Sequence, residues 1–170
     1  ANHQKTKVFN QDIVSIKSKE IMLGYKSIDL IVGGPPCQGF SMAGKRIRKN
    51  GIFINDQRNN LFKEFLRIVS EIKPKFFLME NVPGILTINK GSTKDCILEL
   101  FYSLGYNTNV KVLHAADYGV PQFRKRAFFI GTNLDIEAEN LFPNQTHGPK
   151  KKQYVTVEDA IFDLPFIQSG

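Results

Sequence analysis

Two residues of this sequence have side chains suited to covalent and acid–base chemistry, and each follows a short apolar segment. Cys37 stands in the run Gly-Gly-Pro-Pro-Cys-Gln-Gly-Phe-Ser over residues 33–41, where the prolines stiffen the backbone before the thiol. A thiol becomes a good nucleophile where nearby cations or backbone dipoles favour the thiolate. Glu80 directly follows the apolar run 76–79, and a carboxyl beside an apolar wall suits a general acid.

Each of these residues also has a plainer interpretation. A cysteine can be a small buried hydrophobic residue, which is the interpretation we favour for Cys96 on its amphipathic segment. Glu80 could cap a turn or pair with a lysine. Arg124 and Arg126 lie close together and keep their charge and their fixed fork of donors, which suits binding of a polar group. The alternative interpretation is that these arginines only form a solvated basic strand edge.

The elements around these residues predict how they meet. The run 28–32 is rich in β-branched residues and predicts a buried strand, and 76–79 predicts a second one. Between them, apolar residues recur at helical spacing from 61 to 72, and Pro74 would end the helix. Strand, helix and strand in this order predict a βαβ unit with parallel strands. Ligands of such sheets lie outside the carboxyl ends of the strands, so Cys37 and Glu80 should share one crevice.

The remaining segments predict a second, different pairing. A helix is expected from residue 92 or 93 to 104, and strands over 110–115 and 127–131. The connection between these strands is too short for a helical crossover, so they should be antiparallel. Near the N-terminus we expect a strand over 7–9 and a weak helix before residue 25. After residue 140 the composition becomes polar, which predicts a linker with one short helix over 157–164.

Composition narrows the class of protein. The chain has 170 residues, which suits one compact domain, and no apolar run reaches the roughly 18 residues of a membrane span. Two cysteines make no disulfide framework, and no Cys/His spacing is typical of a metal site. A net charge of +7 favours a polyanionic partner such as nucleic acid, although many basic proteins bind none.

Three motifs in this order resemble those of the DNA (cytosine-5-)-methyltransferases. They are the run around Cys37, the sequence Glu80-Asn81-Val82, and the Gln-x-Arg-x-Arg sequence over 122–126. The resemblance implies an α/β class, namely an incomplete Rossmann-like fold that depends on S-adenosylmethionine. It implies a mainly parallel sheet with an antiparallel pair near the C-terminal end. Residues 1–140 would form a partial catalytic domain, and residues 141–170 a linker and the start of a target-recognition region.

The resemblance also implies a mechanism on a cytosine flipped out of duplex DNA. The Cys37 thiolate would attack C6, while Glu80 binds N3 and the exocyclic amine. C5 would then take the methyl group of S-adenosyl-L-methionine, before loss of the C5 proton releases the cysteine. Arg126 would hold the cytosine O2, and Arg124 would orient the nucleophile loop.

Further residues receive supporting roles from the same resemblance. Asn81 would brace its turn and Gln122 would buttress the arginines. Asp12, Pro35 and Leu61 match cofactor-binding positions, although Asp12 is as readily interpreted as a cap or turn residue. The basic stretch 42–55 would be a lid over DNA rather than only a solvated loop. Its expected DNA contacts, with two residues that precede it, are Gln38, Ser41, Lys45, Arg46, Arg48 and Lys49.

Parts of the family pattern are absent from the sequence. A Phe-x-Gly-x-Gly turn that cradles the cofactor does not occur, and neither does a target-recognition domain. We therefore expect this chain alone to bind S-adenosylmethionine weakly or not at all, and to need a complementary N-terminal or target-recognition segment or subunit. Apolar surface should be exposed where the missing strand would lie. A DNA substrate implies that the protein is located with the DNA, which in a bacterium is the cytoplasm.

Three other functions remain open at this level. A tRNA cytosine-C5 methyltransferase would share the chemistry, although Gly39-Phe40-Ser41 favours the DNA branch. A cysteine hydrolase would need His114 beside the thiol of Cys37, with a third group to orient it. A non-catalytic subunit or binding module of a split enzyme is the third alternative, and the intact set of candidate catalytic residues argues against it.

Overall fold

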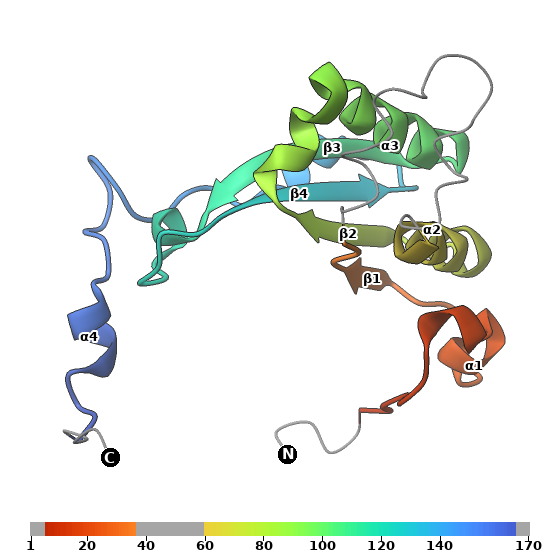
Figure 1. The fold of residues 1–170 in the computed structure, drawn as a ribbon, viewed down its shortest axis with the longest axis horizontal. Helices are drawn as coiled ribbons and strands as arrows, with labels where there is room; N and C mark the ends of the chain where they lie inside the picture. The colour runs from red at the N-terminus through yellow and green to blue at the C-terminus, as the bar shows by residue number, and fades with distance from the viewer. Residues whose placement is uncertain (1–5, 37–59, 166–170) are drawn as a thin grey trace.

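The computed structural model describes residues 6–36 and 60–165, which form a mixed sheet with the helices Asn60–Ile72 and Ser92–Ser103 against one face, while the helix Val157–Ile161 stands apart from the sheet (Figure 1). The helices are α1 (Ser18–Met22), α2 (Asn60–Ile72), α3 (Ser92–Ser103) and α4 (Val157–Ile161). The strands are β1 (Leu30–Gly33), β2 (Phe76–Asn81), β3 (Asn107–His114) and β4 (Lys125–Thr132). Short 3-10 helices include η1 (Ile13–Ser15), η5 (Pro83–Leu86), η6 (Ile88–Gly91), η7 (Ala115–Tyr118) and η8 (Ala138–Leu141).

The sheet has the strand order β1-β2-β4-β3. β1 and β2 are parallel and α2 lies between them in the sequence, which confirms the predicted βαβ unit. The antiparallel pairing of β3 and β4 is confirmed as well. The expectation of a mainly parallel sheet is not met among the described strands, because β4 also pairs antiparallel with β2. β4 reverses after a short connection and enters the sheet between β2 and β3, a choice of partner that no local pattern encodes.

Three sequence predictions about elements need correction. Residues 6–12 form no strand, so the strand expected over 7–9 is wrong. Glu80 does not follow β2 but lies within it, because the ladder with β4 continues through Glu80 and Asn81. The C-terminal helix α4 ends at Ile161 rather than at residue 164. It begins with a capping box, in which hydrogen bonds from Thr156 lower the pKa of Asp159.

The core lies between the sheet and the helices α2 and α3. Phe77 of β2 stacks on Phe101 of α3 with ring centroids 4.0 Å apart, and Phe65 of α2 meets Phe77 edge-to-face at 6.2 Å. Tyr106 is buried in the same cluster and donates a hydrogen bond to the Pro74 carbonyl at 2.7 Å. Burial raises its pKa to about 12. This packing holds α2 and α3 on the face that we call the covered face.

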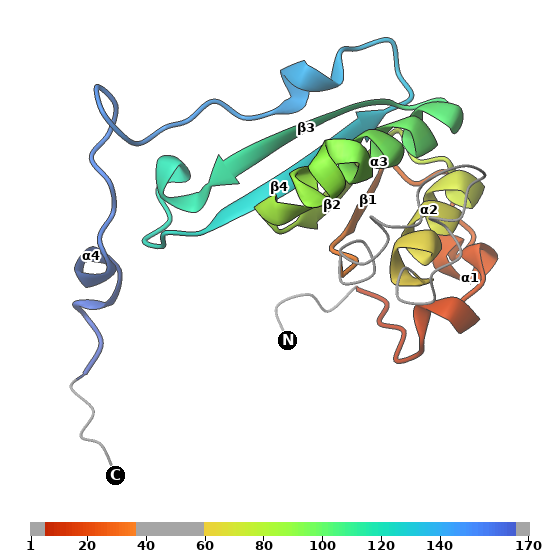
Figure 2. The ribbon, with the colours of Figure 1, turned by 45° about the horizontal axis from the view of Figure 1, so that its top comes forward.

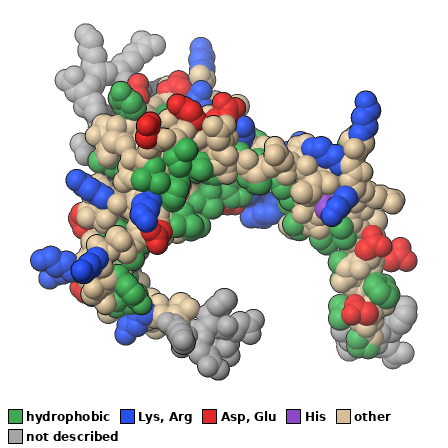
Figure 3. Space-filling model, turned by 180° about the vertical axis from the view of Figure 1, so that it is seen from behind, with side chains coloured by type: hydrophobic (Ala, Val, Ile, Leu, Met, Phe, Trp, Pro, Cys, Tyr) green, Lys and Arg blue, Asp and Glu red, His purple; other side chains and the backbone are tan. Residues whose placement is uncertain are grey.

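The opposite face of the sheet, which we call the open face, is not covered by α2 or α3; the short 3-10 helix η8 lies on it beside β3 and β4, where Glu139 pairs with Lys111 at 3.2 Å. Alternate residues of β1 point to it, and Leu30 and Val32 are 50% and 61% exposed. Seen from this side, Figure 3 shows hydrophobic side chains gathered over the sheet. Apolar side chains are therefore exposed on this face, whereas exposure at the place of the missing strand stays a prediction. No helix within residues 6–36 and 60–165 is long and apolar enough to cross a membrane.

Candidate active site

Glu80 and two arginines converge at the carboxyl end of β2. The Nε of Arg126 lies 2.7 Å from the Glu80 Oε1, and a terminal nitrogen of Arg124 lies 3.6 Å from the same oxygen. The Glu80 and Arg126 side chains are 35% and 24% exposed, and the Arg124 side chain is 48% exposed. Two residues that are more than 40 positions from Glu80 in the sequence thus reach one carboxylate oxygen.

The register of the sheet explains this meeting. Glu80 is paired with Phe128 across the β2–β4 ladder, so their side chains lie on the same face. Arg126 stands two residues before Phe128 and therefore points to that face as a diagonal neighbour of Glu80. A shift of register by one residue would send Arg126 to the covered face. The ion pair therefore depends on the position of β4 beside β2.

A pocket of about 220 Å³ opens beside these groups on the open face. The lining residues are Glu80, Leu113, Ala115, Tyr118, Arg124, Arg126 and Phe128. Pockets for drug-sized ligands measure roughly 300–1,000 Å³, so this one suits a single small ring. One side offers a carboxylate and guanidinium groups, and the remainder is mostly apolar.

The apolar part of this lining is not among the site residues that the sequence predicts. Phe128 and Leu113 contribute to the pocket because each is paired with a residue already named, Glu80 and Arg126 respectively. The alternation along β4 carried a usable signal, since Arg126 and Phe128 are two residues apart and must share a face. The alternation does not predict which strands pair with β4, and these strands supply the rest of the lining.

The segment that leads to Cys37 is attached to the end of β2. The buried Asn81 side chain donates a hydrogen bond to the Pro35 carbonyl at 2.8 Å and accepts one from the Val82 amide at 2.9 Å. A Cβ placed on Gly34 would lie 3.4 Å from the Glu80 Oε2, so the backbone passes close to the carboxylate. Residue 34 is thus adjacent to Glu80, three residues before Cys37.

Several predicted site residues lie outside the described residues. They are Cys37, Gln38, Ser41, Lys45, Arg46, Arg48 and Lys49. The meeting of the Cys37 sulfur with Glu80 therefore stays a prediction. Gln122 is described, and its backbone carbonyl accepts a hydrogen bond from the Arg124 amide at 3.0 Å. Its side chain is exposed, so a buttressing role for Gln122 also stays a prediction.

The predicted cofactor-binding residues lie around β1 and α2. Asp12 caps η1, because its Oδ1 accepts a hydrogen bond from the Val14 amide at 3.0 Å. The cap uses one carboxylate oxygen, and the side chain remains exposed. Leu61 in the first turn of α2 is 43% exposed, whereas Pro35 after β1 is buried.

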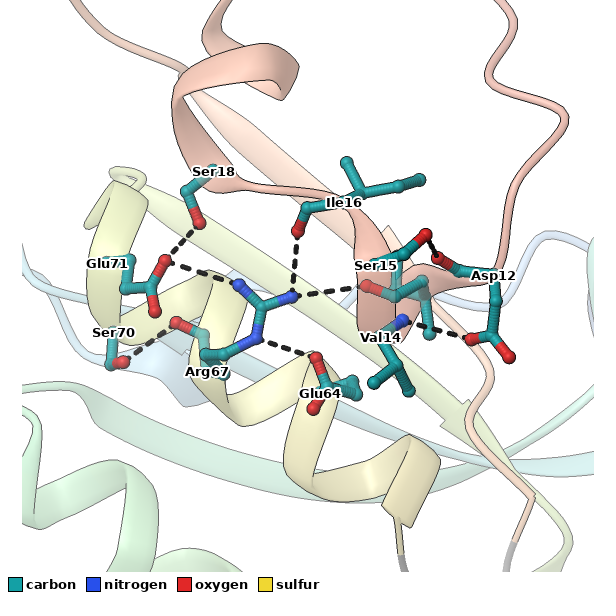
Figure 4. A network of polar contacts seen from close by, with 10 residues as sticks. Asp12, Val14, Ser15, Ile16, Ser18, Glu64, Arg67, Ser70 and Glu71 are labelled. Atoms are coloured by element: carbon teal, nitrogen blue, oxygen red, sulfur yellow. Dashed lines mark hydrogen bonds and ion pairs between the residues drawn. The ribbon is translucent and has the colours of Figure 1, made fainter.

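Arg67 on α2 fixes the turn that Asp12 begins (Figure 4). One terminal nitrogen donates to the carbonyls of Ile13 and Ile16, at 3.2 and 3.1 Å. Its Nε pairs with Glu64 at 2.6 Å, and this hydrogen bond raises the pKa of Arg67. No sequence pattern indicates this role of Arg67, because these carbonyls lie more than 50 residues away in the sequence.

Comparisons with known proteins show the family of the chain. A family model described as C-5 cytosine-specific DNA methylase matches residues 1–166. Type II methyltransferase M1.HphI of Haemophilus parahaemolyticus is 44% identical over 100% of the chain, which spans 44% of its length. Type II methyltransferase M.DdeI of Desulfomicrobium norvegicum is 41% identical over 99% of the chain and 40% of its own length.

A solved structure also resembles the chain. A structure described as a DNA modification methyltransferase, encoded within a prophage of E. coli, is 36% identical with a TM-score of 0.65. The match covers 92% of this chain and 42% of that one. The chain thus spans less than half the length of each of these three relatives.

Proposed function

This chain belongs to the C-5 cytosine-specific DNA methylase family, and from that membership we propose that it carries the cytosine pocket of an enzyme that methylates duplex DNA. The observation that carries the proposal is the Glu80–Arg126 ion pair at 2.7 Å beside a pocket for one ring. N3 and O2 are neighbours on the edge of cytosine. A carboxyl group and a guanidinium group that lie side by side match that edge.

The proposed chemistry begins with the addition of the Cys37 thiolate to C6 of a flipped cytosine. Glu80 supplies the proton at N3 and accepts a hydrogen bond from the exocyclic amine, while Arg126 holds O2. S-adenosylmethionine, when bound, supplies the methyl group that C5 takes. A base removes the C5 proton, and the electrons of that bond form the C5–C6 double bond as the thiolate leaves. The N3 proton returns to Glu80.

The described cofactor candidates fit an adenosyl group. Asp12 keeps an exposed carboxylate, which can accept a hydrogen bond from an adenine amine. Leu61 offers exposed apolar surface for the ring. Pro35 follows β1 by two residues, and its carbonyl accepts a hydrogen bond from Asn81 at the end of β2.

The open face supports a further part of the proposal. We infer that a segment or subunit outside residues 1–170 covers Leu30 and Val32 in the active enzyme, because apolar surface of this extent marks an interaction site. Residues 1–140 would then be part of the catalytic domain, and residues 141–170 would lead to the region that recognises the target sequence. DNA contacts from the basic stretch 42–55, and a cytoplasmic location in a bacterium, belong to the same proposal.

Duplex DNA that contains 5-fluorocytosine tests the proposed function in a full-length protein that includes this chain. Fluorine at C5 cannot leave as a proton, so the covalent adduct should persist after denaturation, provided that S-adenosylmethionine is present. Cys37→Ser should abolish the adduct. Glu80→Gln should slow its formation by about 10²–10⁴-fold, the usual contribution of an acid–base group.

The matched control is Glu99→Gln, which changes an exposed glutamate on α3 and should leave trapping unchanged. Fluorocytosine tRNA serves as the competing substrate. Trapping of tRNA in place of duplex DNA, or an adduct that survives Cys37→Ser, would overturn the proposal.

A further inference from the structure

The chain after β4 runs back along β3 and returns to the loop before the two arginines (Figure 2). Glu137 accepts a hydrogen bond from the Asn107 side chain at 3.1 Å, and Glu139 pairs with Lys111 at 3.2 Å. Tyr118 of η7 donates to the Pro143 carbonyl at 3.2 Å. Residues 137–143 are thus attached to β3 by the side chains of two glutamates and to η7 by Tyr118.

The next part of this segment, residues 144–154, converges on Asp117 of η7. The Asp117 carbonyl accepts hydrogen bonds from the amides of Thr146 and His147, both at 2.9 Å. Its Oδ2 accepts one from the Gln145 side chain at 2.8 Å, and its Oδ1 accepts one from the Tyr154 hydroxyl at 3.2 Å. The Asp117 side chain is only 17% exposed, whereas the bonds that Gln145 and Tyr154 donate to it lie at the protein surface.

Gly119 lies where residues 144–154 pack closely against the loop. A Cβ on Gly119 would lie 2.6 Å from the His147 Cε1, so the imidazole ring rests directly on the glycine backbone. Gly119 also has a φ of +83°, which side chains rarely adopt. Both observations require glycine here if residues 144–154 are to pack on η7.

The same loop is tied to the arginines of the cytosine pocket. The Ala115 amide donates to the Arg124 carbonyl at 2.8 Å. His114 stacks on Phe123 with ring centroids 5.6 Å apart, and its Nδ1 lies 3.6 Å from the Asp117 Oδ1. One short loop therefore contacts both the segment leaving the sheet and the strand that brings Arg126 to Glu80.

We propose that Asp117 is a positioning residue. It fixes residues 144–154 on the loop before Arg124 and Arg126, and so sets the position of the cytosine pocket relative to the DNA-reading region that follows Tyr154. The inference rests on the proposed function, because it assigns to that same pocket a fixed distance from the DNA-reading region. Asp117 touches no substrate. It acts through the segment and the arginines.

The test measures single-turnover methylation of duplex DNA by the full-length protein, at saturating DNA and S-adenosylmethionine, per trapped active site. Asp117→Asn keeps the shape but loses acceptor capacity, and should lower this rate about tenfold or more. Tyr154→Phe and Gln145→Ala should each lower it less. Either one combined with Asp117→Asn should be no slower than Asp117→Asn alone, because both act through one carboxylate.

The control is Asp135→Asn in the exposed loop after β4, which should leave the rate unchanged. A normal rate per trapped site in Asp117→Asn, or additive effects in the double variants, would overturn the inference. If Asp117→Asn fails to fold, the Tyr154→Phe/Gln145→Ala variant decides alone, and a normal rate there overturns it. Failure of the unmodified protein to trap DNA refutes the proposed function instead.

Discussion

The Glu80 site and the Asp12 turn are held in place by different kinds of structure. Glu80 and Arg126 stand on neighbouring strands, where a ladder of backbone hydrogen bonds sets their distance. The carbonyls of the turn after Asp12 are bound to α2 by the Arg67 side chain, and the buried Ile16 and the Ser18–Glu71 hydrogen bond add to this attachment. A site built on a sheet should tolerate a lost side chain without moving, whereas a turn held mainly by side-chain contacts should loosen when one of them is removed.

The largest expected effect comes from the arginines of the sheet-built site. Arg126 contacts the Glu80 carboxylate closely, while Arg124 lies farther away and is twice as exposed. Lysine offers a point charge and cannot bind a carboxylate and a base edge with one planar fork. Arg126→Lys should therefore lower single-turnover methylation by about 10²-fold, the usual loss of one well-placed donor.

Arg124→Lys is the matched comparison, and we expect it to cost less than about tenfold for the same reason of distance and exposure. Equal losses for both variants would mean that the distances to Glu80 do not rank the two arginines in the reaction.

The second prediction breaks the sheet rather than the site. Gly131 of β4 leaves room for the buried Phe77 ring, since a Cβ there would lie 2.0 Å from the Phe77 Cε1. Gly131→Ala should destabilise this chain by on the order of 1–3 kcal/mol, as overpacking in a core does. Gly84→Ala, with nothing within 4 Å of the added Cβ, is the control in the same denaturant titration. An unchanged midpoint for Gly131→Ala would show that the β2–β4 pairing can yield.

The contrast between the regions also separates what the sequence predicts from what it does not. The apolar runs of β1 and β2 and the stripe of α2 are local patterns, and they predicted the βαβ unit. The entry of β4 beside β2 is a matter of tertiary pairing, so neither the Glu80–Arg126 contact nor the place of Phe128 in the pocket followed from periodicity. Motif order predicted that Glu80 and Arg126 share a site, but only the register explains how.

Arg67 and Asp117 escaped the sequence analysis for a related reason. Arg67 binds backbone carbonyls, which leave no trace in residue type, and the Asp117 carboxylate binds Gln145 and Tyr154, which stand far from it in the sequence. Arg67 belongs to an amphipathic helix where a charged residue is ordinary, and Asp117 lies in a connection that predicts only a turn. Contacts of this kind become visible when two distant segments are seen side by side.

The third prediction loosens the Asp12 turn without touching Asp12. Arg67→Met keeps the apolar stem of the side chain but removes its bonds to the Ile13 and Ile16 carbonyls. Hydrogen bonds to a charged donor contribute roughly 1.5–3 kcal/mol, so amide hydrogens at residues 14–16 should exchange about tenfold faster or more. Lys63→Met, which removes another cation of α2, should leave this exchange unchanged.

Arg67→Met also tests the cofactor assignment. In a full-length protein, calorimetry should show roughly tenfold weaker binding of S-adenosylmethionine. The loosened turn must become ordered on binding, and this ordering costs part of the binding free energy. Faster amide exchange without weaker cofactor binding would mean that Arg67 stabilises the turn but that the turn does not contact the cofactor.

The smallest expected effect separates the two roles that Asp12 can have. Serine is about as good a cap as aspartate, so Asp12→Ser should preserve the hydrogen bond to the Val14 amide and the stability of η1. Asp12→Ala should cost about 0.5–2 kcal/mol through the lost cap. If the free carboxylate oxygen binds the adenine amine, Asp12→Ser should weaken S-adenosylmethionine binding about as much as Asp12→Ala, since serine is too short to reach the ring. Binding that follows the cap instead, normal in serine and weak in alanine, would leave Asp12 a turn residue and confine cofactor recognition to other groups.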